Sequence, residues 1–308
     1  MTPPTDSPTT PQFDPPMPHV DGVKHSFVDA GGLRMHVAEA GAGDPVVLLH
    51  GFPQHWYMWR HVIPVLAQQY RVIVPDLRGF GWTEATPNIA DYDKRNMAQD
   101  VINLLDAMNI TQPVKLVGHD WGGWCSFIIS MTAPERVERY LACNIPPPWS
   151  DPSPQAVGSL LKLWYQAVFA TPGLSRFVLA GGGRGVMEKM LARKPDGSHP
   201  FGPEFAAFLD QFQQPERLRA AMLLYRRMLT REVPAIIANK YVPGRLTVPT
   251  RILFGVDDFA VSQKQITRDH SKHADDLTVE LVENCGHFIV DEQPQLVAER
   301  ALAWFNDA

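Results

Sequence analysis

The stretch "LVGHDWGGW", Leu116–Trp124, places Asp120 between two glycines directly after an apolar run. The run "PVKLVGHD" is typical of a strand buried on both faces of a parallel sheet, and "GWCSFIISM" is typical of a helix. A strand, a turn of the form Gly-x-nucleophile-x-Gly and a helix predict an elbow that pushes the central side chain into the cleft at the carboxyl end of the sheet. An aspartate at a strand end can also be a simple helix N-cap, so the prediction needs independent support.

Strand and helix patterns alternate along most of the chain. "KHSFVDA" and "LRMHVAEAG", separated by Gly31 and Gly32, predict a hairpin. Five further apolar runs resemble the strand before the elbow: "PVVLLHG", "RVIVPDLRG", "RYLACNI", "TRILFGVDD" and "LTVELVENCGH". Amphipathic segments such as "NMAQDVINLLDAMNI" lie between them. We therefore predict an α/β fold with a mostly parallel, eight-stranded sheet flanked by helices.

Composition divides the chain into three parts. Residues 1–23 are rich in Pro and Thr and poor in apolar bulk, which predicts a disordered leader. Residues 147–243 contain helical patterns but no buried-strand run, which predicts a helical cap inserted between the sixth and seventh strands. The core then comprises residues 24–146 and 244–308.

Bulk properties exclude several classes of function. The net charge of -5 argues against a nucleic-acid binder, and no apolar run is long enough for membrane insertion. The three cysteines form neither a disulfide framework nor a metal motif, and the N-terminus lacks the pattern of a signal peptide. We expect a cytoplasmic protein without a metal.

Residues with complementary chemistry follow other predicted strands. The backbone N–H of Phe52, in "HGFP", and that of Trp121 are candidate oxyanion-hole donors. "NCGHF" places His287 at the same end of the sheet as a candidate base. "GVDDF" offers Asp258, or its neighbour Asp257, as the acid that orients this histidine. The order nucleophile, acid, base is that of α/β hydrolases.

From about residue 24 onward the chain resembles the epoxide hydrolases of α/β-hydrolase fold. The matching segments are "HGFPQHWYMWR", "DLRGFGWTE", "VGHDWGGW", "GVDDF" and "CGH". Haloalkane and haloacid dehalogenases share the carboxylate elbow, so the elbow alone does not decide the reaction. The family places its acid three residues after a glycine, which favours Asp258 over Asp257; some relatives place it at position 144, which is Asn here.

The aspartate determines the chemistry. A carboxylate with a pKa of roughly 4 is an anion at neutral pH, and it can displace a leaving group at saturated carbon to form an ester. A neutral His287 would then activate water, which attacks the ester carbonyl. We therefore predict substitution at carbon rather than peptide or ester cleavage.

The leaving group separates epoxides from halides. An epoxide oxygen leaves as a strongly basic alkoxide and benefits from a positioned acid, whereas a halide does not need one. Tyr165, in "LWYQAVFATPG", and Tyr225, in "LLYRRMLTRE", have neighbours resembling those of the paired cap tyrosines that protonate the ring oxygen in epoxide hydrolases. The indole N–H of Trp121 keeps a haloalkane dehalogenase open as the alternative. Haloacid dehalogenases need a cation beside the elbow, which "HDWGG" lacks.

We predict an epoxide hydrolase that needs no cofactor and whose partners are water and a hydrophobic small-molecule epoxide. The resemblance implies detoxification, and a homodimer is compatible with it. Trp56 and Trp164 are candidate substrate-binding residues, although helix packing explains Trp56 equally well. Asp76 and Arg78 of "DLRGFG" are expected to form an ion pair within their loop. The alternative of another class is a hydrolase fold without activity that serves as a binding module.

Overall fold

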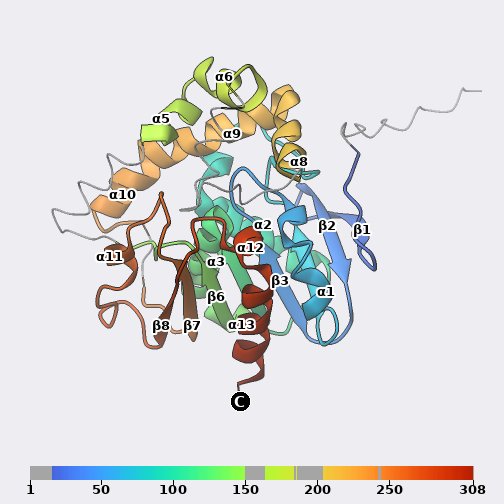
Figure 1. Ribbon diagram of the computed structural model, residues 1–308, viewed down its shortest axis with the longest axis vertical. Helices are drawn as coiled ribbons and strands as arrows, with labels where there is room; N and C mark the ends of the chain where they lie inside the picture. The colour runs from blue at the N-terminus through green and yellow to red at the C-terminus, as the bar shows by residue number, and fades with distance from the viewer. Residues whose placement is uncertain (1–15, 150–163, 184, 186–203, 242–243, 308) are drawn as a thin grey trace, which may run out of the picture.

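A mixed sheet forms the centre of the molecule in the computed structural model, which describes residues 16–149, 164–183, 185, 204–241 and 244–307 (Figure 1). Eight strands lie in the order β1-β2-β4-β3-β5-β6-β7-β8. Strand β2 is antiparallel to both of its neighbours, and the other pairs are parallel. The predicted hairpin and the predicted fold class are confirmed. The strands are β1 (Lys24–Asp29), β2 (Arg34–Ala40), β3 (Pro45–Leu49), β4 (Arg71–Pro75), β5 (Val114–His119), β6 (Val137–Cys143), β7 (Thr250–Gly255) and β8 (Leu277–Val282).

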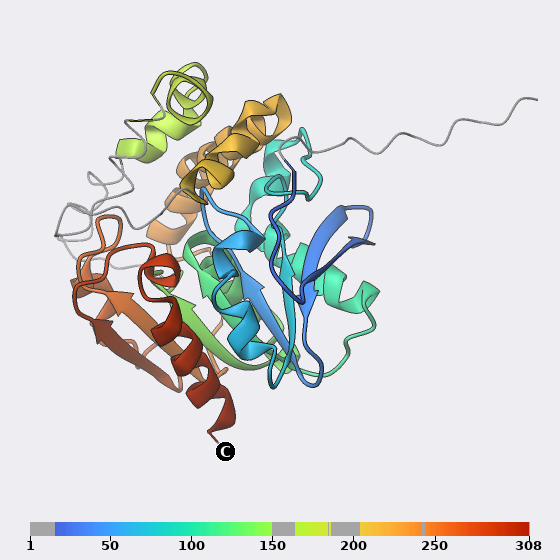
Figure 2. The ribbon, with the colours of Figure 1, turned by 45° about the vertical axis from the view of Figure 1, so that its right-hand side comes forward.

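The central strands are buried because helices cover both faces of the sheet. Every residue of β3 and β5 is buried, which is why their sequences are continuous apolar runs. Helices α2 and α3 pack together on one face, and α1 and α13 on the other (Figures 1 and 2). These helices span Ile63–Leu66 (α1), Lys94–Ala107 (α2), Asp120–Thr132 (α3) and Pro294–Asn306 (α13).

Short helices lie in the loops around the sheet. The α-helical ones are α11 (Gln263–Ile266) and α12 (Ile289–Glu292), and the 3-10 turns are η1 (Trp56–Trp59), η2 (Ile89–Tyr92) and η3 (Pro134–Arg136).

The helices described between β6 and β7, here called the cap, lie over one end of the sheet (Figure 1). Helix α9 is the longest of them and continues through a π-helical turn, η6, into α10. The cap elements are α5 (Trp164–Ala170), α6 (Leu174–Ala180), α8 (Glu204–Asp210), η5 (Gln211–Gln213), α9 (Pro215–Arg227), η6 (Met228–Glu232) and α10 (Val233–Ile237). Much of the predicted segment 147–243 lies outside the described residues, so its bounds stay a prediction.

The N-terminal segment differs in part from the predicted disordered leader. Residues 1–15 lie outside the described residues. Residues 16–23 are described, and Met17, Val20 and Val23 pack against the core while remaining half-buried or exposed. These apolar side chains are spaced among prolines and polar residues, and their contacts with the core are not visible in composition alone.

Candidate active site

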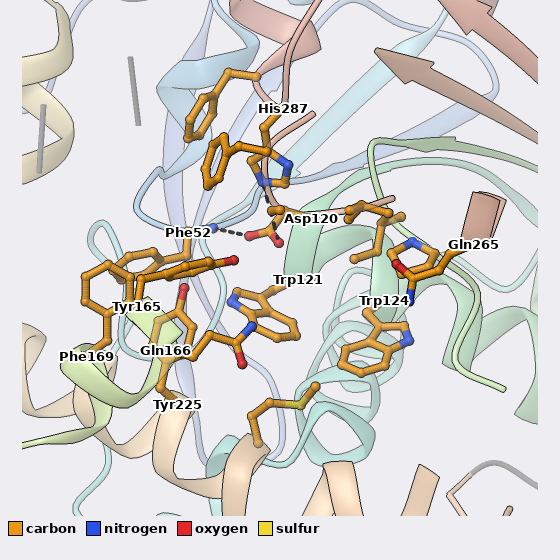
Figure 3. A pocket seen from close by; sticks show the side chains of 17 residues that line it. Phe52, Asp120, Trp121, Trp124, Tyr165, Gln166, Phe169, Tyr225, Gln265 and His287 are labelled. Atoms are coloured by element: carbon orange, nitrogen blue, oxygen red, sulfur yellow. Dashed lines mark hydrogen bonds and ion pairs between the residues drawn. The ribbon is translucent and has the colours of Figure 1, made fainter. Parts of the chain in front are cut away.

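The aspartate of the elbow adopts a backbone conformation that is uncommon for residues other than glycine. Asp120 begins helix α3 directly after β5 and has a φ of 49°. The turn is tight on its inner side: a Cβ on Gly122 would lie 2.4 Å from the backbone oxygens of Leu49 and His50. Residues held in such conformations concentrate at functional sites, where the surrounding structure imposes them. The fold thus directs the Asp120 side chain away from the sheet and into the space below the cap (Figure 3).

Two backbone N–H groups face the Asp120 carboxylate. The N–H of Phe52 donates a hydrogen bond of 2.8 Å to Oδ2, and the N–H of Trp121 also donates to this carboxylate. Burial raises the pKa of Asp120, whereas His287 and the two N–H groups oppose the rise because they stabilise the anion. The two N–H groups expected to form an oxyanion hole therefore contact the carboxylate of the predicted nucleophile.

His287 lies beside Asp120 and is held from behind by Asp258. Its Nδ1 is 2.9 Å from Oδ2 of Asp258, and its Nε2 is 3.9 Å from Oδ1 of Asp120. Burial raises the pKa of Asp258, but His287 and hydrogen bonds, including those from Asn144 and Val261, outweigh it and lower that pKa overall. The neighbouring Asp257 is exposed, so the structure selects Asp258 from the two carboxylates that the sequence left open.

The protonation state of His287 differs from the neutral form expected from the sequence. Burial lowers its pKa, but the carboxylates of Asp258 and Asp120 outweigh burial and raise the pKa to about 9. The imidazole is therefore protonated at neutral pH in the free protein and forms an ion pair with two anions. Sequence spacing alone could not reveal this, because the shift depends on both carboxylates lying on opposite sides of one ring.

Two tyrosines of the cap face the carboxylate across a small cavity. Tyr165 comes from α5 and Tyr225 from α9, and both hydroxyl groups point towards Asp120 (Figure 3). Burial and the charge of Asp120 raise the pKa of Tyr165, and the same two causes raise that of Tyr225 well above its usual range. Both hydroxyls thus keep their protons at neutral pH. Phe169 packs against both rings, with centroids 5.8 Å from Tyr165 and 4.9 Å from Tyr225.

The cavity between these groups has a volume of about 110 Å³ and an apolar wall. Apart from the residues described above, it is lined by Trp124, Ile145, Met228, Phe259, Val261 and others, with Gln166 and Gln265 as polar members. Such a space suits a small hydrophobic molecule with one polar group directed at Asp120.

Neither tryptophan that the sequence suggested for substrate binding lines the cavity. Trp56 is fully buried in the core and packs against His25 and His36 rather than lining the cavity. Trp164 begins α5 with 60% of its surface exposed and does not line the cavity. The sequence shows that a residue lies on a helix near the site, but not which face of the helix meets the cavity.

Asn144 is a functional-site residue that the sequence did not reveal as such. Its side-chain nitrogen donates to Oδ2 of Asp258 (2.8 Å) and to the carbonyl oxygen of Gly286 (3.1 Å). Asn144 therefore holds Asp258 in place, and it does so from the sequence position where some relatives carry the acidic residue itself. The available signal was its place at the end of β6, beside the ends of β5 and β7 in the sheet.

The predicted ion pair between Asp76 and Arg78 is wrong. Asp76 is fully buried and bonds to His36 and to the backbone N–H groups of Trp56 and Trp82. Arg78 instead pairs with Asp100 of α2, at 2.5 Å. Asp76 is directed into the core, whereas Arg78 lies where the chain turns and is directed at α2, which separates the two side chains.

The described residues contain no group of three or more His, Cys, Asp or Glu side chains that could hold a metal ion. Among the helices of the same described ranges, none combines the length and apolar composition needed to cross a membrane.

Known proteins resemble this chain over most of its length. A family model described as alpha/beta hydrolase fold matches residues 44–294. The AB hydrolase superfamily protein YfhM of Bacillus subtilis (strain 168) is 30% identical over 293 residues, which cover 94% of this chain and 100% of that protein. The soluble epoxide hydrolase of Corynebacterium sp. (strain C12) is 32% identical over 290 residues, 92% of this chain and 97% of its own.

Solved structures resemble the chain equally broadly. The epoxide hydrolase CorEH, solved without ligand, has a TM-score of 0.77 and 29% identity and covers 92% of this chain and 98% of its own. The epoxide hydrolase VrEH1 from Vigna radiata has a TM-score of 0.79 and 25% identity and covers 94% of this chain and 99% of its own.

Proposed function

The chain belongs to the α/β-hydrolase fold family, and we propose that it is an epoxide hydrolase in which Asp120 opens the ring and His287 drives hydrolysis of the resulting ester. The observation that carries the proposal is the juxtaposition of a carboxylate nucleophile with two protonated tyrosine hydroxyls across one apolar cavity. Similarity over nearly the full chain to the soluble epoxide hydrolase of Corynebacterium supports the same reaction.

In the first step, a carboxylate oxygen of Asp120 attacks a ring carbon of the epoxide. The bond between this carbon and the ring oxygen breaks, and its electron pair stays on the oxygen, which takes a proton from Tyr165 or Tyr225. The product is a hydroxyalkyl ester of Asp120. Because an alkoxide is a much stronger base than a tyrosinate, general-acid help of this kind contributes about 10²–10⁴ in rate.

In the second step, His287 acts as a base. Formation of the ester removes the negative charge of Asp120, one of the two charges that raise the pKa of His287, so the imidazolium gives up its proton, which restores the tyrosine hydroxyl. The neutral imidazole takes a proton from water, and the water oxygen adds to the ester carbonyl. The N–H groups of Phe52 and Trp121 stabilise the resulting oxyanion, at about 2.7–4 kcal/mol per donor. Collapse expels the alkoxide, which takes the proton back from the imidazole to complete a vicinal diol. The regenerated carboxyl group of Asp120 then protonates His287, which restores the starting ion pair.

The residues of the site supply every group that these two steps need, so the proposed reaction uses no cofactor. Its partners are water and a hydrophobic epoxide small enough to enter the cavity. A cytoplasmic location, a homodimer and a role in detoxification stay predictions from the sequence.

Trapping the ester tests the proposal. His287→Ala removes the base of the second step but leaves Asp120 in place. After incubation with styrene oxide, we expect the intact mass to increase by the mass of the epoxide, with the added mass on the peptide that contains Asp120. The variant His287→Ala/Asp120→Asn is the matched control and should remain unmodified.

The same experiment separates the alternatives. Modification by a bromoalkane but not by the epoxide would replace the proposed function with that of a haloalkane dehalogenase, for which the indole N–H of Trp121 would hold the halide. Absence of modification by small epoxides and bromoalkanes alike would favour a binding module without activity.

A further inference from the structure

An ion pair that is completely buried joins the core to the cap beside the active site. The Nζ of Lys94, the first residue of α2, lies 2.5 Å from Oε2 of Glu232, and neither side chain is exposed. The other carboxylate oxygen of Glu232 accepts hydrogen bonds of 2.7 Å from the backbone N–H of Lys94 and from the hydroxyl of Tyr241. Each of the two carboxylate oxygens thus has at least one donor.

The ammonium group of Lys94 lies over an aromatic ring of the site. Its Nζ is 4.4 Å from the ring centroid of Trp121, the residue that follows the nucleophile. Trp121 in turn contacts Tyr225 edge to face, with centroids 5.8 Å apart, and its indole nitrogen faces the Tyr225 hydroxyl (Figure 3). The indole nitrogen is buried and has no hydrogen-bond partner among the described residues, so it is free to donate to the Tyr225 hydroxyl, and its proximity opposes the rise in the pKa of Tyr225 that burial causes.

Glu232 is rigidly connected to Tyr225. It ends the π-helical turn η6, which follows α9 without a break, and it lies seven residues after Tyr225. Both side chains are buried: Tyr225 lines the cavity and Glu232 contacts Lys94 of the core. Turns of this type are rare and are found frequently at functional sites.

Stability alone does not account for such a pair. Desolvation of two charges costs about as much as their attraction returns, and an apolar pair of similar volume is often equally stable. A charge placed against the ring of Trp121 has a chemical effect, however. A cation over one face of an indole draws electron density from it and makes its N–H a stronger donor.

We propose that Lys94 and Glu232 are positioning residues for ring opening: they fix α9 on the core and strengthen the Trp121 indole as a donor to the hydroxyl of Tyr225. The proposal rests on the proposed function, because Tyr225 is assigned there as a proton donor. A Tyr225 hydroxyl that accepts a hydrogen bond from the indole transfers its own proton more readily, since the bond stabilises the tyrosinate that remains.

The rate of ring opening tests this role directly. In the His287→Ala background hydrolysis is blocked, so the growth of the ester with time, followed by intact mass with styrene oxide, reports ring opening alone. We expect Lys94→Met to slow it by about tenfold or more and Lys94→Arg, which keeps the cation, to stay within about threefold of the parent. An unchanged rate in Lys94→Met would overturn the proposal.

Lys115 provides a matched control. It is also a buried lysine paired with a glutamate, Glu138, at 2.6 Å, and it lies 5.7 Å from the ring centroid of Tyr70, but at the opposite end of β5 from Asp120. Lys115→Met should leave the rate of ring opening unchanged. If Lys115→Met slowed ring opening as much as Lys94→Met does, both effects would reflect general destabilisation, and the proposal would be overturned. If Lys94→Met does not fold, Glu232→Gln takes its place, because glutamine keeps the volume of glutamate and one oxygen acceptor. We expect Glu232→Gln to slow ring opening by about tenfold or more, and an unchanged rate would overturn the proposal.

A second readout does not depend on the reaction. If the parent protein forms no ester with any epoxide tried, the proposed function fails, and the effect of Lys94 on Trp121 is then judged from tryptophan fluorescence. Loss of the ammonium should shift the emission maximum in the wild-type background but not in Trp121→Phe. An equal shift in both backgrounds would overturn the interaction with Trp121.

Discussion

Two tyrosine hydroxyls approach the nucleophile from different cap helices, so each can donate a proton to the ring oxygen. We expect Tyr165→Phe and Tyr225→Phe to slow ester formation by about 10–100-fold each, and the double variant by about 10³–10⁴-fold. Single-turnover intact-mass kinetics in the His287→Ala background would measure this step. Tyr57→Phe is the control, since Tyr57 is half-buried and does not line the cavity. Ring opening at the parent rate in the double variant would remove both hydroxyls from the mechanism.

Asn144 holds the acid rather than the nucleophile, and its replacement should therefore affect the second step. Asn144→Ala removes one donor from Oδ2 of Asp258, the oxygen that contacts His287, so this contact is held less firmly. We expect hydrolysis of the ester to slow by about tenfold while ester formation changes by less than about threefold. Rapid-quench measurement of both rate constants in one experiment checks the split. An equal loss in both would indicate general disruption of the site.

Single residues were predictable where chain order constrained them. Asp120, Asp258 and His287 each follow a strand of the parallel part of the sheet, and parallel strands end at one edge, which is why the structure brings them together. Trp56 and Trp164 lacked such a constraint, because their orientation depends on how a short helix is rotated. The raised pKa of His287 was also beyond the sequence, since it arises from three-dimensional charge placement.

The elbow depends on close contact between two elements, helix α3 and the end of β3. A methyl group on Gly122 would collide with the backbone oxygens of Leu49 and His50 at 2.4 Å, and backbone cannot move aside as a side chain can. We expect Gly122→Ala to lower the free energy of unfolding by about 1–3 kcal/mol and to abolish ester formation. Chemical denaturation and intact mass measure the two effects.

Gly182 of the cap is the control for this substitution. A Cβ there would meet a single atom of Phe177 at 3.8 Å, an ordinary contact distance. Gly182→Ala should therefore change the free energy of unfolding by less than about 0.5 kcal/mol. If Gly122→Ala proved as stable and as active as Gly182→Ala, the turn would be looser than the structure indicates.

Elements were predictable from periodicity when they were long or buried. The fully buried β3 and β5 coincide with continuous apolar runs, and the hairpin of β1 and β2 with alternating ones. The π-helical turn η6 was not predictable, because "MLTRE" continues the helical pattern of α9 and the wider turn is fixed by the buried contacts of Glu232. Tertiary contacts, and not local preference, set such irregularities.

For the molecule as a whole, the protonation of His287 links stability to pH. Its pKa is about 9 in the folded protein against an ordinary value of 6.5. A raised pKa means that the ion pairs with Asp120 and Asp258 contribute fully below about pH 6.5 and are lost as the pH rises through about 9. Relative to His287→Gln, we expect wild type to lose about 1–3 kcal/mol of unfolding free energy between these limits. Urea denaturation at several pH values measures the difference; parallel curves would mean that the imidazole is neutral throughout.

The arrangement of cap and core was predictable only in outline. The loss of strand patterns after β6 and their return at β7 indicated an insertion, and the structure places its described helices over the carboxyl ends of the strands (Figure 1). The contacts that fix this arrangement were not visible in the sequence. Gln211 of the cap, for example, accepts from the backbone N–H of Gly81 and donates to the carbonyl oxygen of Pro53, two residues of separate core loops.

The hydrogen bond between the N–H of Phe52 and Oδ2 of Asp120 makes the two oxygens of one carboxylate unequal. In the proposed mechanism Oδ2 is retained by its hydrogen bond to the backbone, so Oδ1, which faces His287, is the atom expected to leave with each diol and to be replaced from water. In heavy-oxygen water one oxygen of Asp120 should become labelled within the first few turnovers, while the other acquires label only when the carboxylate rotates. The ratio of singly to doubly labelled enzyme would then give the number of catalytic cycles per rotation of the Asp120 carboxylate, and so the rate of that rotation relative to turnover.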